Sequence, residues 1–507
     1  MTYDLMLKPD GEPNRILAGN VHPADWTNPQ PAGRYDLVVI GGGTAGLVSA
    51  AGAAALGAKV ALIEGGLLGG DCLNVGCVPS KALIRASRAV FDVRTSAAFG
   101  MAGAEGGEAD FGAAMERMRR IRADMSRHDS AWRFRDELGV DVYLGQGKLT
   151  GPDSVEVEGT ELLFARAALC TGARAAAPPI PGLAHAGYLT NESVFSLTAL
   201  PGRVAVVGAG PIGCELAQVF ARFGSQVTIV ERSGQILGRE DRDAAQLLHS
   251  AFLREGIRIE LGAAVNRVEQ HSCGKRLFLE REGTVSELEV DEILVGTGRA
   301  PNVEGLGLEN AGVEYDGKGI RVSDTLQTSN RRIFAAGDVC SAYKFTHMAD
   351  AHARILIANA LFMGRKKVSA LTIPWCTYTD PEVAHVGMYE ADADARGIAV
   401  QTLTVPLSEV DRAVLDGEAE GFARVHLKKG SDAILGATIV ARHAGEMISE
   451  LSLAIGSGLG LSAIGNTIHP YPTQAEVIRK LADAYNRNRL TPGLRKFLAT
   501  WLRLRRR

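Results

Sequence analysis

The sequence predicts an α/β fold in which one strand–turn–helix–strand unit occurs twice and a β-rich region follows. A glycine-rich turn, Gly41–Gly46, comes directly after an apolar strand, and the same plan returns 167 residues later at Gly208–Gly213. From about residue 371 the pattern changes to apolar strands, such as 423–427 and 434–440, with helices after them. Because 507 residues exceed what one hydrophobic core supports, several domains are expected.

The first unit begins with residues 35–40, a predicted buried strand, and continues into Gly41-Gly-Gly-Thr-Ala-Gly46. An alanine-rich helix runs to Gly57, a strand covers 59–63, and Glu64 ends it. In this context the first glycine of G-x-G-x-x-G permits the turn, the second lets backbone approach a pyrophosphate, and the third lets helix pack on strand. The helix start supplies N–H donors, and the acid binds ribose hydroxyls. The candidate contacts are Gly41, Gly43, Thr44, Ala45, Gly46 and Glu64.

The second unit repeats this order with a strand at 203–207, the turn Gly208-Ala-Gly-Pro-Ile-Gly213, a helix, Gly224 and a strand at 226–230 that ends in Glu231. A single turn of this kind is weak evidence, since a glycine-rich loop explains it equally well. Two copies in register predict two bound dinucleotides. The candidate contacts here are Gly208, Gly210, Ile212, Gly213, Glu231 and Arg232.

A long helical stretch is expected between the two turns, from about residue 111 to 138. Its apolar residues at helical spacing are Met115, Met118, Ile121, Met125 and Trp132. We interpret them as core packing in preference to a substrate or metal path. The arginines at positions 117, 119, 120 and 122 are expected to form a solvated face.

Composition excludes several classes of protein. Lys plus Arg number 55 against 58 Asp plus Glu, a net charge of −3, so nothing indicates nucleic-acid binding. Seven cysteines, an odd number in a long chain, argue against a secreted disulfide scaffold. The first ten residues contain no apolar run typical of a signal peptide, and no stretch approaches the ~18 apolar residues of a membrane span. The expected location is the cytoplasm.

Cys72 and Cys77 are the only cysteines close together in the sequence, within Gly69-Gly-Asp-Cys-Leu-Asn-Val-Gly-Cys-Val-Pro-Ser-Lys81. A separation of about one helical turn makes a disulfide possible if a helix begins here, and a helix start also lowers a thiol pKa. A zinc site would need two more cysteines or histidines at short spacing, and none lies within twenty residues. The position beside a nucleotide-binding turn favours redox chemistry.

This cysteine motif, the repeat, and the runs Val295-Gly-Thr-Gly-Arg-Ala-Pro-Asn302 and Ile333-Phe-Ala-Ala-Gly-Asp338 resemble the class I pyridine nucleotide-disulfide oxidoreductases, the family of dihydrolipoyl dehydrogenase, glutathione reductase and mercuric reductase. The resemblance implies two Rossmann-like domains, for FAD and for NADH or NADPH, and a C-terminal α+β dimerisation domain. The implied divisions are an N-terminal extension at 1–33, an FAD-binding domain at 34–182 and 301–370, an NAD(P)-binding domain at 183–300, a dimerisation domain at 371–492 and a tail at 493–507.

The same resemblance assigns site residues. Cys77 is the thiolate facing the flavin, Cys72 attacks or ligates the substrate, and Lys81 pairs with Glu215 near the flavin. Positions matching family contacts to FAD are Gly147, Thr171, Gly172, Ala173, Asp338, Lys344, Thr346 and His347. Gly298 and Arg299 match the region that closes over the nicotinamide nucleotide, and Val265 is a further candidate on that side.

One departure from the family pattern bears on the substrate. Disulfide-exchanging members carry His-Pro-x-x-x-Glu near the C-terminus, whereas the run here, His469-Pro-Tyr-Pro-Thr-Gln-Ala-Glu476, places Tyr471 at the histidine position. Tyrosine, with a pKa near ~10, is a poor base at neutral pH. Mercuric reductases also carry tyrosine there, but their C-terminal cysteine pair is missing, since no cysteine follows Cys376. Whether Tyr471 or His469 acts stays open.

The leading hypothesis is therefore an NAD(P)H oxidoreductase that passes electrons through Cys72 and Cys77 to a thiol-reactive metal ion, held only transiently by these two sulfurs. A reductase of a small disulfide or quinone is the alternative enzyme, and a flavoprotein redox sensor at a membrane surface is an alternative of another class. Glu231 favours NADH, because a carboxylate repels a 2′-phosphate, whereas Arg232 would accommodate NADPH. A homodimer with an active site shared between subunits is expected.

The C-terminal segment 494–507 combines apolar residues at helical spacing with six basic residues and no acid. The apolar residues are Leu494, Phe497, Leu498 and Trp501, and the basic residues are Arg495, Lys496, Arg503, Arg505, Arg506 and Arg507. The pattern is typical of a helix at a membrane surface, while packing on a partner subunit or a frayed tail explains it as well.

Overall fold

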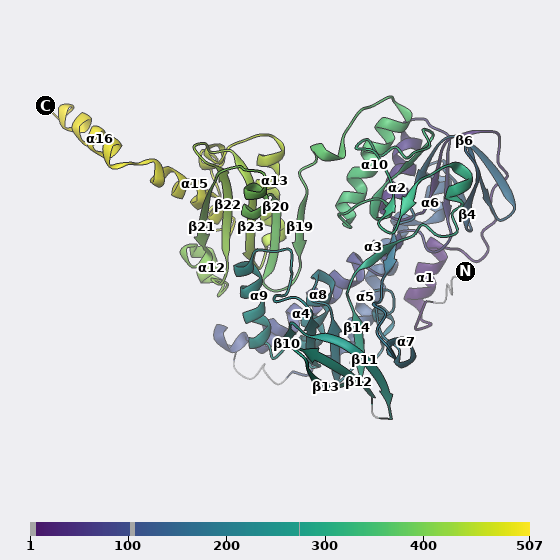
Figure 1. The fold of residues 1–507 in the computed structure, drawn as a ribbon, viewed down its shortest axis with the longest axis horizontal. Coiled ribbons are helices and arrows are strands. Elements are labelled where there is room, and N and C mark those ends of the chain that lie inside the picture. The colour runs from purple at the N-terminus through teal and green to yellow at the C-terminus, as the bar shows by residue number, and fades with distance from the viewer. Residues whose placement is uncertain (1–6, 102–106, 273, 507) are drawn as a thin grey trace. The chain divides into compact units, whose positions relative to one another are not determined.

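The structure, a computed structural model, describes residues 7–101, 107–272 and 274–506 (Figure 1). Its contacts divide the chain into two compact units. The first unit comprises Met1–Ile236 and Glu255–Ala370, and the second comprises Leu237–Arg254 and Leu371–Arg507. The domain boundaries expected from the sequence stay predictions.

The first sheet of the first unit has a parallel core in the order β3-β2-β1-β6-β18, continued by the antiparallel strands β5 and β4. Its strands are β1 (Tyr35–Ile40), β2 (Val60–Glu64), β3 (Asp141–Leu144), β4 (Gly147–Gly151), β5 (Ser154–Val157), β6 (Thr160–Leu169) and β18 (Ile333–Ala335). Helix α2 (Thr44–Ala55) leaves β1 through the first glycine turn and packs against α10 (Thr346–Leu361). β1 is buried along almost its whole length, as parallel strands covered on both faces are.

A second parallel sheet has the order β10-β9-β8-β14 and repeats the plan of the first. Its elements are β8 (Arg203–Val207), α8 (Pro211–Phe223), β9 (Gln226–Glu231), β10 (Arg258–Leu261) and β14 (Glu292–Val295). An antiparallel sheet of β11 (Ala264–His271), β12 (Gly274–Arg281) and β13 (Thr284–Val290) precedes β14. Both predicted strand–turn–helix–strand units are therefore confirmed. Each turn lies at the carboxyl end of a central parallel strand, where dinucleotides bind in such folds.

The shorter elements of the first unit connect these sheets. They are α3 (Gly70–Asn74), α4 (Cys77–Arg94), β7 (Ala173–Ala175), α7 (Leu183–Ala186), β15 (Arg299–Pro301), β16 (Tyr315–Asp316) and β17 (Gly319–Ile320). β7 and β15 pair antiparallel, so the chain leaves and re-enters the first nucleotide-binding region side by side.

The predicted helix from about 111 to 138 is divided into α5 (Phe111–Met125), a 3-10 turn at Ser126–Asp129 and α6 (Ala131–Asp136). Met115 and Met118 are fully buried, which confirms core packing for these two residues. The expectation of a solvated arginine face was wrong for Arg119 and Arg122, which are 4% and 3% exposed. Both donate to oxygen atoms inside the fold, and that compensates for burial of a charged group.

The N-terminal extension covers the β3 edge of the first sheet. Helix α1 (Glu12–Val21) packs on α5, and the Trp26 indole N–H donates to the Val142 carbonyl at 3.2 Å. The Asn28 amide both donates to the Leu144 carbonyl and accepts from the Leu144 N–H. These bonds satisfy backbone groups that an edge strand would otherwise leave unpaired.

The second unit is built on an antiparallel sheet in the order β19-β20-β23-β22-β21. Its strands are β19 (Pro374–Thr377), β20 (Glu382–Gly387), β21 (Val400–Pro406), β22 (Phe422–Lys428) and β23 (Ile434–Ala441), and its helices are α9 (Arg242–Arg254), α11 (Glu390–Ala395), α12 (Asp411–Leu415), α13 (Ala444–Gly456), α14 (Leu461–Gly465), α15 (Glu476–Arg489) and α16 (Pro492–Leu504). Helix α13 packs on β20 and β23, and α15 packs on β21 and β22. Figure 1 shows α16, in yellow, extending beyond α15 and away from this sheet.

Candidate active site

The two cysteines lie on consecutive short and long helices of the first unit. Cys72 is in α3, and Cys77 is the first residue of α4, directly after Gly76. A Cβ on Gly76 would lie 2.7 Å from the Asp71 carbonyl oxygen, so only glycine fits this connection. Both thiols are free in this structure and hydrogen-bond to each other. The expectation that a helix begins at the pair is confirmed.

The environment separates the proton affinities of the two sulfurs. The hydrogen bond from Cys72, joined by Thr346 and the charge of Lys81, lowers the pKa of Cys77 to about 6, although desolvation by the surrounding protein opposes this shift. The same bond and burial raise the pKa of Cys72. The start of an 18-residue helix adds a positive dipole end at Cys77. At neutral pH, Cys77 is therefore the thiolate and Cys72 the thiol that donates to it.

Two further side chains hold this arrangement. Lys81 Nζ donates to Glu215 Oε2 at 2.8 Å, the pair that the family resemblance implies, and the Glu215 side chain on α8 is 6% exposed. The Thr346 hydroxyl, at the start of α10, lies 3.2 Å from Cys77 Sγ. Helices α4, α8 and α10 thus converge on the thiolate.

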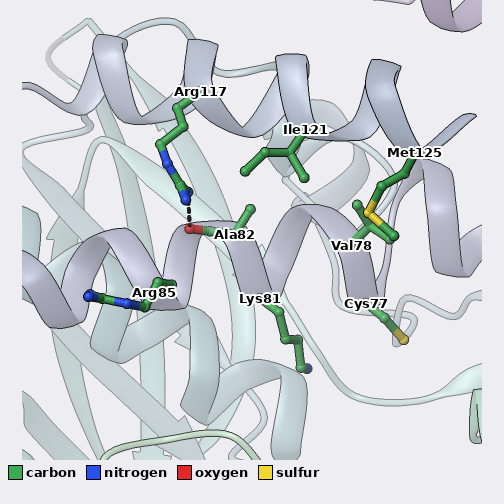
Figure 2. Close-up of a pocket in the computed structure, with 8 residues that line it drawn as sticks. All are labelled: Cys77, Val78, Lys81, Ala82, Arg85, Arg117, Ile121 and Met125. Atoms are coloured by element: carbon green, nitrogen blue, oxygen red, sulfur yellow. Dashed lines mark hydrogen bonds between the residues drawn. The ribbon is translucent and has the colours of Figure 1, made fainter.

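A pocket of about 340 Å³ opens between α4 and α5 beside Cys77. Its lining residues are Cys77, Val78, Lys81, Ala82, Arg85, Arg117, Ile121 and Met125. In Figure 2, Arg117 reaches from α5 toward the Ala82 carbonyl oxygen on α4, at 3.5 Å, while Lys81 points away from α5. The pocket offers an apolar wall with two arginines at its side, next to an exposed sulfur.

The first glycine turn has the geometry of a pyrophosphate cradle. Gly41 has φ +106°, and a Cβ on Gly46 would lie 1.7 Å from the Gly41 carbonyl oxygen. Gly43 caps α2 in extended conformation, with Thr44 and Ala45 forming the first helical turn. Glu64 accepts from the N–H groups of Gly42 and Gly66 at 2.5 and 2.6 Å, and burial raises the pKa of Glu64 against these donors.

The second turn repeats the first bond by bond. Gly208 has φ +99°, and a Cβ on Gly213 would lie 2.1 Å from the Gly208 carbonyl oxygen. Glu231 accepts from the N–H groups of Ala209 and Ser233, both at 2.8 Å, so the offset of 167 extends to Gly42/Ala209 and Gly66/Ser233. Burial would raise the pKa of Glu231, but these bonds outweigh it and lower the pKa.

Several predicted FAD contacts gather where β6, β7, β15 and β18 end. The Thr171 hydroxyl donates to the Asn302 carbonyl, and Gly172 has φ +68°. Asp338 lies 3.6 Å from Arg299 Nε, and the Lys344 ammonium donates to the Asp338 carbonyl at 2.7 Å. Burial raises the pKa of Asp338, against the charges of Arg299 and Lys344. The other predicted contacts lie at the start of β4 (Gly147), in β7 (Ala173) and stacked on the Phe345 ring (His347).

Arg299 connects the predicted FAD contacts to the segment that carries Cys72 and Cys77. Its Nη2 donates to the carboxylate of Asp71, the residue before Cys72, and to the Ala173 carbonyl at 2.7 Å. Its neighbour Gly298 has φ +154°. The structure therefore places Arg299 between Asp71 and Asp338, close to the first nucleotide region.

The other predicted nicotinamide-nucleotide contacts belong to the second sheet and its neighbour. Ile212 is exposed in the first turn of α8, Gly210 caps that helix, and Arg232 is exposed directly after β9. Val265 lies in β11 and packs against the apolar core of this region.

Tyr471, His469 and Glu476 belong to the second unit. The Tyr471 ring is 69% exposed, and its hydroxyl donates to Asp411 Oδ2 at 2.9 Å, a bond that raises the pKa of the phenol. The His469 side chain is only 7% exposed, with Nε2 3.0 Å from Glu450 and Nδ1 3.1 Å from the Thr467 carbonyl. Glu476 begins α15 beside Lys480, at 3.7 Å.

The sequence did not indicate several buried residues that hydrogen-bond to the backbone around the site. Asn74 and Arg122 are buried beside the cysteine segment, and His352 accepts from the Gly337 N–H at 3.3 Å. Burial lowers the pKa of His352 to about 4, so the ring stays neutral. Asp71 adjoins a cysteine and could have been suspected, whereas nothing in the sequence links positions 74 and 122.

Fold and site together define a two-dinucleotide oxidoreductase with a redox-active thiol pair. The family comparisons agree. Residues 35–353 match the family described as pyridine nucleotide-disulphide oxidoreductase, and residues 373–482 match its dimerisation domain.

Individual relatives fall into two groups. A mercuric reductase of Lysinibacillus sphaericus is 36% identical over 456 residues, covering 90% of this chain and 83% of that protein. A dihydrolipoyl dehydrogenase of Chlamydia muridarum is 35% identical over 457 residues, covering 87% and 95%. The Cu(II) complex of the HOCl-induced flavoprotein disulfide reductase RclA from Escherichia coli matches with a TM-score of 0.79 at 29% identity, over 88% of this chain and 98% of that one.

The chain belongs to the pyridine nucleotide-disulphide oxidoreductase family. It is an enzyme of that family, with FAD and NAD(P)H as cofactors, and its dimerisation domain supports a homodimer. The two glycine cradles, which any side chain would fill, fit two pyrophosphates. Among the helices that the structure describes, none is long and apolar enough to cross a membrane.

Proposed function

We propose that this enzyme reduces a thiol-reactive metal ion, delivered as a small thiol complex, with electrons that leave through Cys72 and Cys77. The observation that carries the proposal is the hydrogen-bonded pair of free thiols with unlike proton affinities at the start of α4. FAD, when bound, supplies the two-electron chemistry that takes a hydride from NAD(P)H. The overall reaction would consume NAD(P)H and a divalent ion bound by two thiolates, and would yield NAD(P)⁺, a proton, the metal atom and the two released thiolates.

The residues of the chain have distinct parts in this proposal. Cys77 holds a thiolate that Lys81 and Thr346 stabilise, and Cys72 keeps its proton until a substrate displaces it. Two neighbouring sulfurs are soft ligands, which suit soft metal ions. The chemistry of the donor set thus supports a metal substrate, as does the Cu(II) complex of the E. coli reductase.

Tyr471 favours a metal complex over a disulfide as the substrate. Exchange with a disulfide needs a base that accepts and returns a thiol proton near neutral pH. Tyr471 is a phenol whose bond to Asp411 raises its pKa, so it keeps its proton. His469 is engaged at both ring nitrogens, by Glu450 and by its own loop. A ligand-exchange reaction of a metal complex has less need of such a base.

A substrate panel tests the proposal. Purified enzyme with NADH or NADPH would be given Hg(II) with excess thiol, oxidised glutathione and quinones, and dihydrolipoamide would be tested with NAD⁺. We expect rapid NAD(P)H oxidation with Hg(II), lost in Cys72→Ala. Turnover with dihydrolipoamide alone would reject the metal substrate and support the second candidate, a disulfide or quinone reductase. Dihydrolipoyl dehydrogenase relatives favour that candidate.

Helix α16 supports a second proposal, that the enzyme binds reversibly to an anionic membrane surface. The structure buries none of its residues, and Leu494, Phe497, Leu498 and Trp501 form an apolar face. Arg495, Lys496 and Arg503 lie on the opposite side, and the described part of the helix carries no acid to repel anionic lipids. Arg507 lies outside the described residues.

Sedimentation with vesicles tests this contact. The full chain should pellet with vesicles of mixed anionic and neutral phospholipid, and a chain lacking residues 494–507 should stay in the supernatant. Equal pelleting of both chains would end the idea. Binding that survives high salt and neutral lipid alone would contradict the electrostatic part.

A further inference from the structure

The N-terminal extension makes direct contact with the segment that carries the cysteines. The extension precedes residue 35, where the family match begins. Val21 accepts from the Leu68 N–H at 3.2 Å, and His22 Nδ1 lies 2.5 Å from the Gly66 carbonyl oxygen. Gly66 and Leu68 belong to the loop that runs from β2 into α3, so the extension holds the chain just before Cys72.

A buried chain of hydrogen bonds reaches the other side of the same segment. Arg122 Nη1 donates to the Asn74 carbonyl oxygen and Nη2 donates to Asn14 Oδ1, both at 2.7 Å. Asn14, on α1, is 3% exposed, and its amide in turn donates to the Pro9 carbonyl at 2.8 Å. Asn74 is the last residue of α3, between Cys72 and Cys77. One guanidinium thus ties the extension to the turn between the two cysteines.

Burying the Arg122 guanidinium would cost free energy if its bonds to Asn74 and Asn14 did not compensate for it. Its side chain is buried, and among the described residues it makes no ion pair. Burial, with Arg119 nearby, lowers the pKa of Arg122 to about 10, so the charge persists at neutral pH. A cation at the carboxyl end of a helical turn satisfies carbonyl groups that have no partner within the helix. The only side-chain acceptor that the structure records for it is Asn14.

The Asn74 side chain also holds the backbone that precedes Cys72. Its amide nitrogen donates to the carbonyls of Leu68 and Gly70 at 3.0 and 2.9 Å. The buried Asn74 side chain, which follows Cys72, therefore holds two backbone carbonyls that precede Cys72. Arg122 in turn holds the Asn74 backbone. Movement of Asn74 would alter the approach of the two sulfurs, and a disulfide tolerates only a narrow range of separations.

We propose that Asn14 and Arg122 are positioning residues through which the N-terminal extension sets the geometry of the Cys72–Cys77 pair. Neither residue touches a sulfur in the structure. Their effect is on how readily the two thiols close into a disulfide, through the turn at Asn74. The inference rests on the proposed redox role of the pair.

The test compares two asparagines of the same helix. In holoenzyme equilibrated with reduced and oxidised glutathione, the fraction of Cys72–Cys77 disulfide gives the equilibrium constant of closure. Asn14→Leu removes the acceptor for Arg122 and is expected to lower this constant about tenfold, which corresponds to about 30 mV. Asn20→Leu, the matched control, loses only a bond to Ser126 and should stay within about twofold. Asn14→Asp keeps the acceptor oxygen for Arg122 and loses only the bond to Pro9, so its constant should stay within about twofold of the wild-type value.

Each outcome decides the proposal. A folded, FAD-containing Asn14→Leu enzyme with the wild-type constant would overturn it. The proposal would also be overturned if the closure constant fell equally in Asn14→Leu and Asn20→Leu, in proportion to a lower Tm. That result would indicate general destabilisation of the protein. If Asn14→Leu does not fold, Asn14→Asp against Arg122→Lys gives the same comparison. Lysine has one nitrogen at the end of its side chain, whereas Arg122 reaches its two partners with two separate nitrogens. A wild-type protein that never forms the disulfide would instead refute the proposed function.

Discussion

At the scale of single residues, the protonation of one sulfur is the feature on which the chemistry depends. Cys77 lies at a helix start and is stabilised as a thiolate by a thiol donor, a hydroxyl and a neighbouring ammonium. These outweigh the desolvation by surrounding atoms that would raise the pKa of the thiol. Since the pKa is lowered to about 6, the thiolate is present above that pH and lost below it. Cys72 is held protonated over the same range.

Alkylation of the reduced enzyme measures this directly. The rate of Cys77 carboxamidomethylation should be half-maximal near pH 6. The alkylation rate of an ordinary thiol is half-maximal at about pH 8.5. Lys81→Met removes a cation whose charge lowers the pKa of Cys77, so the midpoint should rise by about one pH unit. Arg85→Met, on the same helix and the same pocket wall, is the control and should leave the midpoint in place.

Glu231 is the residue that we expect to decide between NADH and NADPH. Hydrogen bonds from Ala209 and Ser233 lower its pKa, so the carboxylate is ionised and aligned to accept from ribose hydroxyls. We expect kcat/KM to favour NADH, and Glu231→Ala to reduce the NADH/NADPH ratio about tenfold. A wild-type preference for NADPH would contradict this and assign the exposed Arg232 to its 2′-phosphate.

At the scale of elements, the strand–glycine turn–helix–strand unit explains why the nucleotide regions could be predicted from the sequence. The turn conformation depends on local sequence, so Gly41 and Gly208, Gly46 and Gly213, and the acids Glu64 and Glu231 are visible without any tertiary contact. The structure adds that even the N–H donors to these acids keep the offset of 167.

Other parts of the site depend on contacts between distant segments and could not be predicted. The arginines of α5 have a pattern compatible with solvent, yet Arg122 reaches Asn74 and Asn14, 48 and 108 residues away in the chain. Lys81 and Glu215 were paired only through family resemblance. Arg299 bonds to Asp71, 228 residues away in the chain, and its motif gives no indication of this contact.

The repeat allows a matched pair of variants. Gly46→Ala would bring its Cβ to 1.7 Å from Gly41 O and should abolish FAD retention, whereas Gly213→Ala should spare FAD and raise the Kd for NADH at least about tenfold. Gly234→Ala, where a Cβ meets nothing within 4 Å, is the control for both. Flavin absorbance and NADH titration distinguish the two results. Loss of FAD in Gly213→Ala would show that the units are not independent.

At the scale of the whole molecule, the dimerisation domain implies that exposed apolar side chains of the second unit are covered by another copy. Ile468 is 94% exposed and Leu453 is 67% exposed, and the family domain spans both. A dimer interface in this domain would remove such side chains from water.

Sedimentation tests the assembly. The enzyme should sediment at twice the chain mass of 53.7 kDa, and Ile468→Asp should shift it toward the monomer. Val285→Asp, an exposed site on β13 of the first unit, should leave the mass unchanged. A wild-type monomer would contradict both the dimer and a site shared between subunits.

The number of electrons that the enzyme accepts in an anaerobic titration tests most directly whether Cys72 and Cys77 take part in the redox reaction. If Cys72 and Cys77 form a redox couple in series with the flavin, the oxidised wild-type enzyme should take up about four electrons per chain, and Cys77→Ser or Cys72→Ser about two. An uptake of two electrons by the wild-type enzyme, unchanged in both variants, would show that the sulfurs take no part.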